Sequence, residues 1–561
     1  MTEPIARRSL LASTATTGLT LAGVSFAHAA ERPGGGPDGP THTRTVRGTL
    51  PAGSPDYVYL PVDVPRGVGE LSVSYAYEKT PVPPGIQGNA LDIGLFDERG
   101  TELGGRGFRG WSGGARTSFF LRGDTATPGY LAGPLRAGTW HIVLAPYTVA
   151  PGGLPYEVTV TLRFGEPGRT PAPVHPPQRA GGRGRAWYRG DCHIHTVHSD
   201  GRRTPAEVAA AARAAGLDFI NSSEHNTTSA HGAWGGLWGD DLLILTGEEI
   251  TTRNGHVLAV GTDPGTFVDW RYRARDQRFG RYAHQVRRAG GLVVPAHPHA
   301  TCIGCHWKFG FAEADAVEVW NGPWTPDDEI ALAEWDNALV ASVREPAWRS
   351  AREPVRGSVR EPGPGAQGWL PAVGGSDAHR EPDRLGLPQT VVLADELSRD
   401  AILAGIRAGR SYLAESSDVT LSFTASDGRG RHAGIGERLR PASADAPVTV
   451  TLEVSGLPGL TAHLVTDQGT LVTTPLPASG KGVVEWRTTP ARSAYVRAEV
   501  RHPATVPGLP GALAALTNPV FLTVLPGRAE AEGGRHRGTM DRRSDNPGIR
   551  RSGRAARERD M

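Results

Sequence analysis

The sequence predicts an α/β domain in the middle of the chain, flanked on each side by a β-sandwich-like domain. Apolar and polar residues alternate in short runs over residues 43–164 and 417–524, as in strands that bury one face of an antiparallel sheet. Between these regions, over residues 186–414, short apolar runs alternate with segments of helical length. Histidines and carboxylates follow many of the central apolar runs, so the functional residues are expected at one rim of a βα barrel.

The two ends of the chain are expected to lie outside these domains. Residues 1–29 have the features of an export signal, because Arg7 and Arg8 precede a weakly apolar run and a small-residue cleavage site. The paired arginines favour the twin-arginine route, which predicts a secreted protein. The arginine-rich tail, residues 526–561, lacks apolar periodicity and is expected to be disordered.

Composition excludes two classes of partner. A net charge of +2 is too balanced for a nucleic-acid-binding protein, which would need a clustered basic face. Apart from the export signal, no stretch of apolar residues approaches the length that spans a bilayer. We therefore expect neither a nucleic-acid partner nor a membrane span.

The first β-domain is predicted from five alternating runs separated by Gly/Pro turns. It resembles the jelly-roll accessory domains of secreted bacterial hydrolases. Residues 165–185 contain five prolines and are expected to be a linker. The five runs are residues 57–60, 71–75, 90–96, 139–144 and 156–162.

The central region carries clear helix signals. Thr204-Pro205-Ala206-Glu207 is a capping box with proline at the first helical position, and it predicts a helix that continues to Gly216. A second helix is expected over residues 275–289, ended by two glycines. Residues 342–368 contain a repeated Arg-Glu-Pro motif and are expected to form a low-complexity surface insertion.

The side chains after the central strands form a pattern typical of a metal site. His193 and His195 are two residues apart, so in a strand they point to the same side and can hold one ion together. An aspartate, Asp200, follows five residues after the pair, and single histidines or glutamates then recur near successive apolar runs. Histidines gathered by chance would not show this order. The pattern predicts a metal-dependent hydrolase.

The ordered motifs resemble the PHP (polymerase and histidinol phosphatase) superfamily. They are His193-Ile194-His195 with Ser199-Asp200-Gly201, then Glu224-His225-Asn226, Glu248-Glu249-Ile250, His297-Pro298 and Ser376-Asp377-Ala378-His379. The resemblance implies a distorted (β/α)7 barrel that holds two or three divalent ions. The Gly-Glu-Glu-Ile-Thr run and the C-terminal β-domain are most similar to the carbaryl hydrolase branch. The implied ligands are His193, His195, Asp200, His225, Glu249, His256, His297, Asp377 and His379.

Such a ligand set predicts hydrolysis of a small-molecule or polymer-derived ester by a metal-bridging hydroxide, with Asp377 holding or orienting this nucleophile. A phosphoester is the expected substrate. A carboxyl-ester, carbamate or amide hydrolase with the same ions is the alternative, and a surface-binding protein with an inactive barrel is the second. Mixed histidine and carboxylate ligation suits Zn, Mn or Fe.

Four further features have open interpretations. Cys302 and Cys305 can form a local disulfide or remain a reduced pair, and with His306 they also match a c-type haem attachment signature or a structural metal site. Cys192 is expected to pack in the core. His198 and His299 lie near ligands in the sequence and are candidate substrate contacts. Arg380 follows His379 and is a third candidate, for a phosphate or carboxylate.

Overall fold

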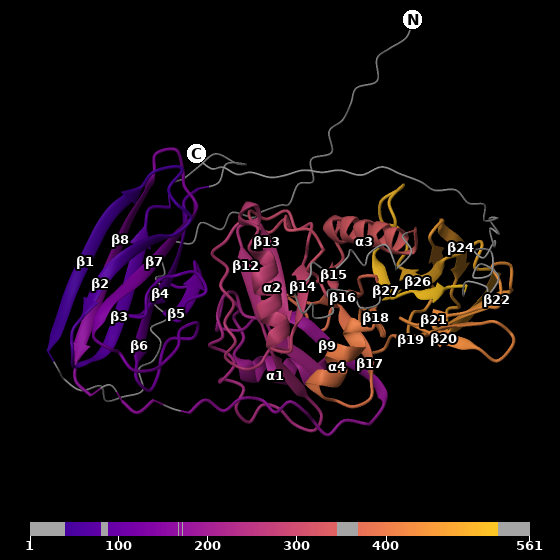
Figure 1. Ribbon diagram of the computed structural model, residues 1–561, viewed down its shortest axis with the longest axis horizontal. Helices are drawn as coiled ribbons and strands as arrows, with labels where there is room; N and C mark the ends of the chain where they lie inside the picture. The colour runs from indigo at the N-terminus through magenta and orange to yellow at the C-terminus, as the bar shows by residue number, and fades with distance from the viewer. Residues whose placement is uncertain (1–39, 80–87, 167, 171, 345–367, 525–561) are drawn as a thin grey trace, which may run out of the picture.

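The computed structural model describes residues 40–79, 88–166, 168–170, 172–344 and 368–524. The predicted signal peptide, the basic tail and most of the predicted insertion at 342–368 lie outside these ranges. The fold is mixed α/β and rich in strands, which form several sheets along an elongated molecule (Figure 1). Within the described ranges, no helix has both the length and the apolar character needed to cross a membrane.

The N-terminal β-domain consists of strands β1 to β8. They form two antiparallel sheets of four strands each, in the orders β1-β8-β3-β6 and β2-β7-β4-β5. Leu71, Ile93 and Trp140 come from both sheets and are buried in one shared core. The bounds are β1 Thr41–Leu50, β2 Val58–Val64, β3 Val68–Tyr77, β4 Ala90–Phe96, β5 Phe108–Gly113, β6 Ser118–Arg122, β7 Gly138–Thr148 and β8 Leu154–Phe164.

Strand β1 shows why the sequence predicted fewer strands here than the structure contains. Its side chains are exposed along most of its length, because it pairs only with β8 at the edge of its sheet. An edge strand of this kind has no apolar alternation for sequence analysis to detect.

The central region carries the candidate site. Its strands are β9 Ala186–Ile194, β10 Phe219–Ser222, β11 Leu243–Thr246, β12 Glu248–Thr252, β13 Gly255–Val260, β14 Leu292–Ala296, β15 Val317–Asn321, β16 Ala372–Gly375, β17 Gln389–Ala394 and β18 Ser411–Ala414. Its helices are α1 Pro205–Ala214, α2 Phe279–Arg288, α3 Pro326–Arg344 and α4 Arg399–Arg407, with a 3₁₀ turn at Ala274–Asp276.

Both helix predictions can be compared with the structure. Thr204 caps α1, with the reciprocal bonds to Glu207 that define a capping box and with proline in the first turn. Helix α2 starts at Phe279, four residues later than predicted. The reason is local, because the preceding residues form the 3₁₀ turn and Gln277 then takes a left-handed conformation (φ 52°) that interrupts the helix.

The distorted (β/α)7 barrel implied by the resemblance stays a prediction, because the central strands do not join into one closed sheet in the described residues. In the described residues they fall into separate hydrogen-bonded sheets, with β9, β10 and β11 parallel, β15 and β16 parallel, and β12, β13 and β14 antiparallel. Strands β12 and β13 are antiparallel because the short turn Arg253-Asn254 joins them as a hairpin, which leaves no room for a crossover helix.

The C-terminal β-domain, strands β19 to β28, is continuous with the central region. Strand β18 pairs with β27, so an eleven-stranded sheet runs from β11 through β9 and β17 into β26 and β24. A second sheet has the order β20-β19-β22-β25. The bounds are β19 Thr420–Ser426, β20 His432–Gly434, β21 Arg438–Leu439, β22 Val448–Ser455, β23 Thr461–Thr466, β24 Gly469–Pro475, β25 Gly482–Thr488, β26 Tyr495–Arg501, β27 Leu513–Thr517 and β28 Val520–Leu522.

Candidate metal centre

The ends of the central strands bring the nine predicted ligands together. Three groups of side chains each place their nitrogen and oxygen atoms within 4.8 Å of one another. The groups share His193 and His195, so they form one continuous cluster. They are His195, Asp200, His225 and His379; His193, His195 and Asp377; and His193, Glu249 and His297.

Glu249 lies at the centre of the cluster. Its Oε2 atom is 3.3 Å from the Nε2 atoms of His193 and His195. The same oxygen is 2.8 Å from His225 Nδ1. Its Oε1 atom is 2.8 Å from His256 Nδ1 and 3.2 Å from His297 Nε2. One buried carboxylate thus faces five imidazoles, and together these groups offer the mixed oxygen and nitrogen ligands that suit a transition-metal ion.

Two aspartates complete the cluster. Asp377 Oδ1 lies 3.3 Å from His193 Nε2 and 3.0 Å from His195 Nε2. Asp200 Oδ1 lies 3.5 Å from His225 Nε2 and 3.2 Å from His379 Nε2. Asp377 is largely buried, whereas the Asp200 side chain is 45% exposed, so the Asp200 side of the cluster opens toward solvent.

The backbone at the strand ends is arranged to aim these side chains. Asn226, His297 and Asp377 have positive φ angles of 52°, 27° and 50°, a conformation that costs energy for most residues and clusters at functional sites. Strand β16 also approaches β9 closely, because a Cβ at Gly375 would lie 2.5 Å from the His193 Cβ. Only glycine allows this contact, which places Asp377 beside His193.

The acidic and basic groups shift each other's pKa in opposite directions. Burial by itself favours a neutral Glu249, but the neighbouring histidines, led by His225, reverse this and hold its pKa well below the usual value. Burial likewise opposes a charge on His225, but Glu249 and Asp200 raise its pKa to about 10. His256 differs, because burial outweighs Glu249 and lowers its pKa to about 4. The carboxylates are therefore anionic at neutral pH.

The cluster contains polar atoms that only a further group would satisfy. His193 Nε2, His195 Nε2, Glu249 Oε2 and Asp377 Oδ1 are buried and have no hydrogen-bond partner. Buried polar groups are normally paired, and an unpaired one costs on the order of 1–3 kcal/mol. These four atoms face each other at distances near 3 Å, so a cation among them would satisfy all of them. The residues therefore fit divalent metal ions.

A buried carboxylate that sequence reasoning missed supports the cluster from behind. Glu318 on β15 is 1% exposed and accepts hydrogen bonds from the His297 backbone N–H at 2.7 Å and from Asn321 Nδ2 at 3.1 Å. Its Oε1 atom is also 3.1 Å from His193 Nδ1. Carboxylates in this position orient metal-binding histidines. The available signal was a charged residue inside the apolar run of Val317 and Val319.

Two further buried acids hold the loops of the site. Asp191 Oδ1 accepts hydrogen bonds from the backbone N–H groups of His193 and Ser376, which ties β9 to the loop after β16. Glu224 accepts hydrogen bonds from Thr196 and from the Ser199 hydroxyl. Neither acid reaches the ligand cluster directly, so we assign both a structural role.

The three candidate substrate contacts lie elsewhere. His198 Nδ1 is 2.9 Å from Ser229 Oγ, and His299 Nε2 is 2.6 Å from Glu334 Oε2 on α3. The Arg380 side chain is exposed. None of the three lines the cavity beside the cluster, so their contact with substrate stays a prediction.

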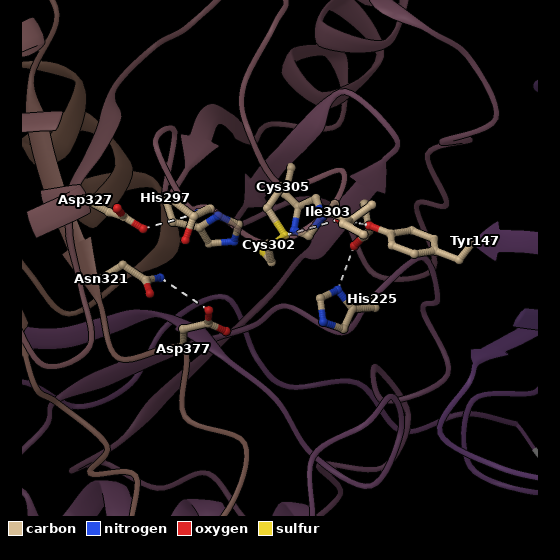
Figure 2. The surroundings of a disulfide bond; sticks show 12 residues. Tyr147, His225, His297, Cys302, Ile303, Cys305, Asn321, Asp327 and Asp377 are labelled. Atoms are coloured by element: carbon tan, nitrogen blue, oxygen red, sulfur yellow. Dashed lines mark hydrogen bonds between the residues drawn. A yellow bond between two sulfur atoms is a disulfide. The ribbon is translucent and has the colours of Figure 1, made fainter. Parts of the chain in front are cut away.

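The two nearby cysteines form a disulfide in the loop after β14 (Figure 2). This leaves neither thiol free for haem attachment or for a structural metal. The Tyr147 hydroxyl of the N-terminal β-domain donates to the Ile303 carbonyl inside this loop (Figure 2). The third cysteine, Cys192, is free and buried in the core, as expected from its place in β9.

Comparison with known proteins gives limited matches. Residues 369–411, which include β16 and Asp377, match the family model described as PHP-associated. A search of curated proteins finds no match to the chain. The site's own side chains therefore carry the case for function.

Among solved structures, the chain is similar to a two-domain protein from Bacteroides vulgatus that contains a predicted PHP-like metal-dependent phosphoesterase. The two sequences are 15% identical, the match covers 62% of this chain and 99% of that chain, and the TM-score is 0.31. A second, named as a metal-dependent phosphoesterase from Bifidobacterium adolescentis, has 20% identity, 41% and 96% coverage and a TM-score of 0.24. An amidohydrolase from Chromobacterium violaceum with bound sulfate and no metal has 18% identity, 35% and 89% coverage and a TM-score of 0.23.

Proposed function

We propose that this protein is a metal-dependent hydrolase of the PHP type that cleaves phosphoesters. The observation that carries the proposal is the set of buried, unpaired nitrogen and oxygen atoms that face one another around Glu249. The family match at residues 369–411 supports it, because this segment supplies Asp377. The cluster is surrounded by the ends of seven strands, β9, β10, β12, β13, β14, β15 and β16. We infer that these strands correspond to the distorted seven-stranded barrel.

The protein's own residues have distinct roles in this proposal. Two or three divalent ions, Zn, Mn or Fe, would be held by the nine clustered side chains and would supply Lewis acidity and a water of lowered pKa. Glu249 faces the largest number of imidazoles and is the proposed bridging carboxylate. Asp377 turns Oδ1 toward the histidines, while its Oδ2 accepts a hydrogen bond from Asn321 Nδ2 at 3.4 Å and keeps a second lone pair that could hold or accept a proton.

Measurement of metal content together with an ester screen tests this function. We expect at least two ions per chain after purification without chelator, and turnover of 4-nitrophenyl phosphate or its diester. Glu249→Gln keeps the size of the side chain and is expected to abolish turnover, whereas Glu485→Gln, an exposed position on β25, leaves turnover unchanged. Less than one ion per chain after reconstitution with Zn, Mn or Fe contradicts the proposal.

The same screen separates the rival functions. The ions would serve a carboxyl-ester, carbamate or amide hydrolase of the carbaryl hydrolase branch equally well, so turnover of a 4-nitrophenyl carboxylate or an aryl carbamate without phosphoester turnover favours that branch. A fully metal-loaded protein that turns over none of these esters favours a surface-binding role with an inactive barrel.

Export is a separate proposal that depends on the sequence alone. We propose that the protein is secreted by the twin-arginine route, because Arg7 and Arg8 precede the apolar run of the signal. Changing both arginines to lysine should retain the protein in the cytoplasm. Unchanged secretion of this double variant, measured by immunoblot of the culture medium, would assign export to the general pathway.

A further inference from the structure

A cavity of about 420 Å³ opens beside the metal centre, and two domains form its wall. Asp200, His225 and His256 line it from the central region. Asp92 and Tyr147 line it from the N-terminal β-domain. Small-molecule sites usually have volumes of roughly 300–1,000 Å³. A substrate whose reacting bond lies at the cluster would therefore rest its remaining part against the N-terminal β-domain.

The two walls are packed together by a shared apolar core. Phe108 and Trp111 of the N-terminal β-domain lie in one buried cluster with Val257 and Trp270 of the central region. Trp111 and Trp270 are in edge contact, with ring centroids 4.7 Å apart. The N-terminal β-domain is therefore a fixed wall of the cavity.

Polar contacts fix the same interface. Arg253, in the turn between β12 and β13, donates hydrogen bonds to the Pro146 carbonyl at 2.7 Å and to the Tyr147 carbonyl at 3.0 Å. Arg273 forms an ion pair with Asp56 at 2.6 Å. The Arg253 guanidinium is thus already engaged by the protein and is poorly placed to bind a substrate anion.

Asp92 is the acidic group on the N-terminal wall. Among the described residues, no hydrogen bond or ion pair engages its carboxylate, although Arg253 acts on it at longer range. Burial raises its pKa to about 6 despite the opposing effect of Arg253. Gly114 lies next to Asp92 and has no side chain. Even a Cβ built on Gly114 would be 3.4 Å from Asp92 Oδ1, which is an ordinary van der Waals distance, so this side of the carboxylate is not crowded.

A half-buried carboxylate without a direct partner carries part of the cost of desolvation, and a ligand that brings a positive charge offsets this cost. Tyr57, Trp111 and Trp270 line the same cavity. Aromatic side chains combined with a carboxylate are the surroundings that favour an alkylammonium group. A second anionic group on the substrate would instead be repelled by Asp92.

We propose that this cavity binds the non-reacting part of the substrate and that Asp92 pairs there with a positively charged ammonium group. The inference deepens the proposed function and depends on it for the placement of the reacting bond. It names the substrate class as phosphoesters whose non-reacting part carries an ammonium group. It also makes the N-terminal β-domain a determinant of specificity.

A matched pair of phosphonates tests the inference without turnover, because a carbon–phosphorus bond is not hydrolysed. The first is 2-(trimethylammonio)ethylphosphonate, and the second is its neutral isostere 3,3-dimethylbutylphosphonate. Their dissociation constants are measured by calorimetry on the metal-loaded protein, on Asp92→Asn and on Asp63→Asn. Asp63 is an exposed residue on β2 of the same domain, so Asp63→Asn is the matched control.

We expect the cationic phosphonate to bind the wild-type protein and the control at least about tenfold more tightly than the isostere, which corresponds to roughly 1.4 kcal/mol. Asp92→Asn should bring the two constants to within about twofold while leaving the isostere's own affinity unchanged, which also shows that the variant is folded. Equal binding of the pair to the wild-type protein overturns the inference, as does discrimination that survives in Asp92→Asn.

A parallel assay keeps the two proposals apart. The 4-nitrophenyl diesters of phosphorylcholine and of 3,3-dimethylbutyl phosphate are offered to the metal-loaded wild-type protein. Phosphonate discrimination without turnover of either diester removes the proposed phosphoesterase function and leaves the ammonium site standing. Turnover of both diesters at equal kcat/KM, with equal phosphonate binding, removes the ammonium site and leaves the proposed function.

Discussion

Replacing Glu318 by glutamine tests whether the buried acid behind the cluster positions the metal-binding histidines. The substitution keeps the size of the side chain but exchanges one acceptor oxygen for an NH₂ donor. Glu318 is surrounded by donors, the His297 backbone N–H and the Asn321 side-chain amide, with His193 Nδ1 at 3.1 Å. When His193 Nε2 faces a metal ion, its Nδ1 carries the proton, so the new NH₂ group would face at least one N–H group and lose a hydrogen bond.

The expected magnitude follows from this loss. A hydrogen bond to a charged group contributes about 1.5–3 kcal/mol, and each 1.4 kcal/mol is a factor of about ten in affinity. Loss of a partner that orients a metal-binding histidine typically costs about 10- to 100-fold in metal affinity. The two estimates agree, so we expect the dissociation constant of the tightest ion to rise by about 10- to 100-fold in Glu318→Gln.

Competition with a chromogenic chelator measures this constant, and turnover at saturating metal is measured on the same sample. Glu485→Gln is the control, since Glu485 is exposed on β25. A purely structural role for Glu318 would lower the melting temperature of the metal-free protein without changing the metal affinity of the folded fraction. A dissociation constant within threefold of the wild-type value would refute the positioning role.

Three other predictions concern charge. Asp377→Asn removes the charge beside His193 and should lower kcat by roughly 100-fold or more, measured with metal content; near-wild-type turnover would exclude a functional role. In metal-free protein His225 and His379 have pKa values raised to about 10 and about 9, so their stabilisation is complete below about pH 6.5 and is lost above it. The melting temperature should therefore fall from pH 7 to pH 10 after EDTA treatment, and a flat profile would contradict the coupling. Glu499→Gln removes the carboxylate that Arg497 and Arg501 share and leaves each buried arginine with one acidic partner, Asp336 or Glu329, so it should cost about 3 kcal/mol in urea unfolding; a midpoint unchanged from wild type would refute this.

The sequence predicted the cluster better than the sheet that carries it. The spacing of His193 and His195 and the placement of single ligands after apolar runs depend on local geometry, which a sequence records directly. The strand directions depend on connections, and the short turn after Thr252 makes β12 and β13 a hairpin instead of parallel strands. Asn254-Gly255 was the available signal, because this dipeptide is common in tight hairpins.

Residues that act through tertiary contacts could not be predicted in the same way. Asp92 lies in a strand more than a hundred residues before the nearest ligand, and only the docking of the N-terminal β-domain brings it to the cavity. No local motif marks such a residue. Glu318 is intermediate, since a buried acid in an apolar strand is visible in the sequence but its partner is not.

The two β-domains therefore contribute to the site in different ways. The C-terminal β-domain supports the strand that leads to Asp377, because the Asn518 side chain accepts from the Ala372 N–H and donates to the Ala372 carbonyl at the start of β16. Strand pairing between β18 and β27 makes that support continuous with the central sheet. The N-terminal β-domain instead faces the open side of the cluster through the cavity. Changes in the C-terminal β-domain should accordingly affect folding and metal binding together, whereas changes at the cavity wall should alter the choice of substrate at constant metal content.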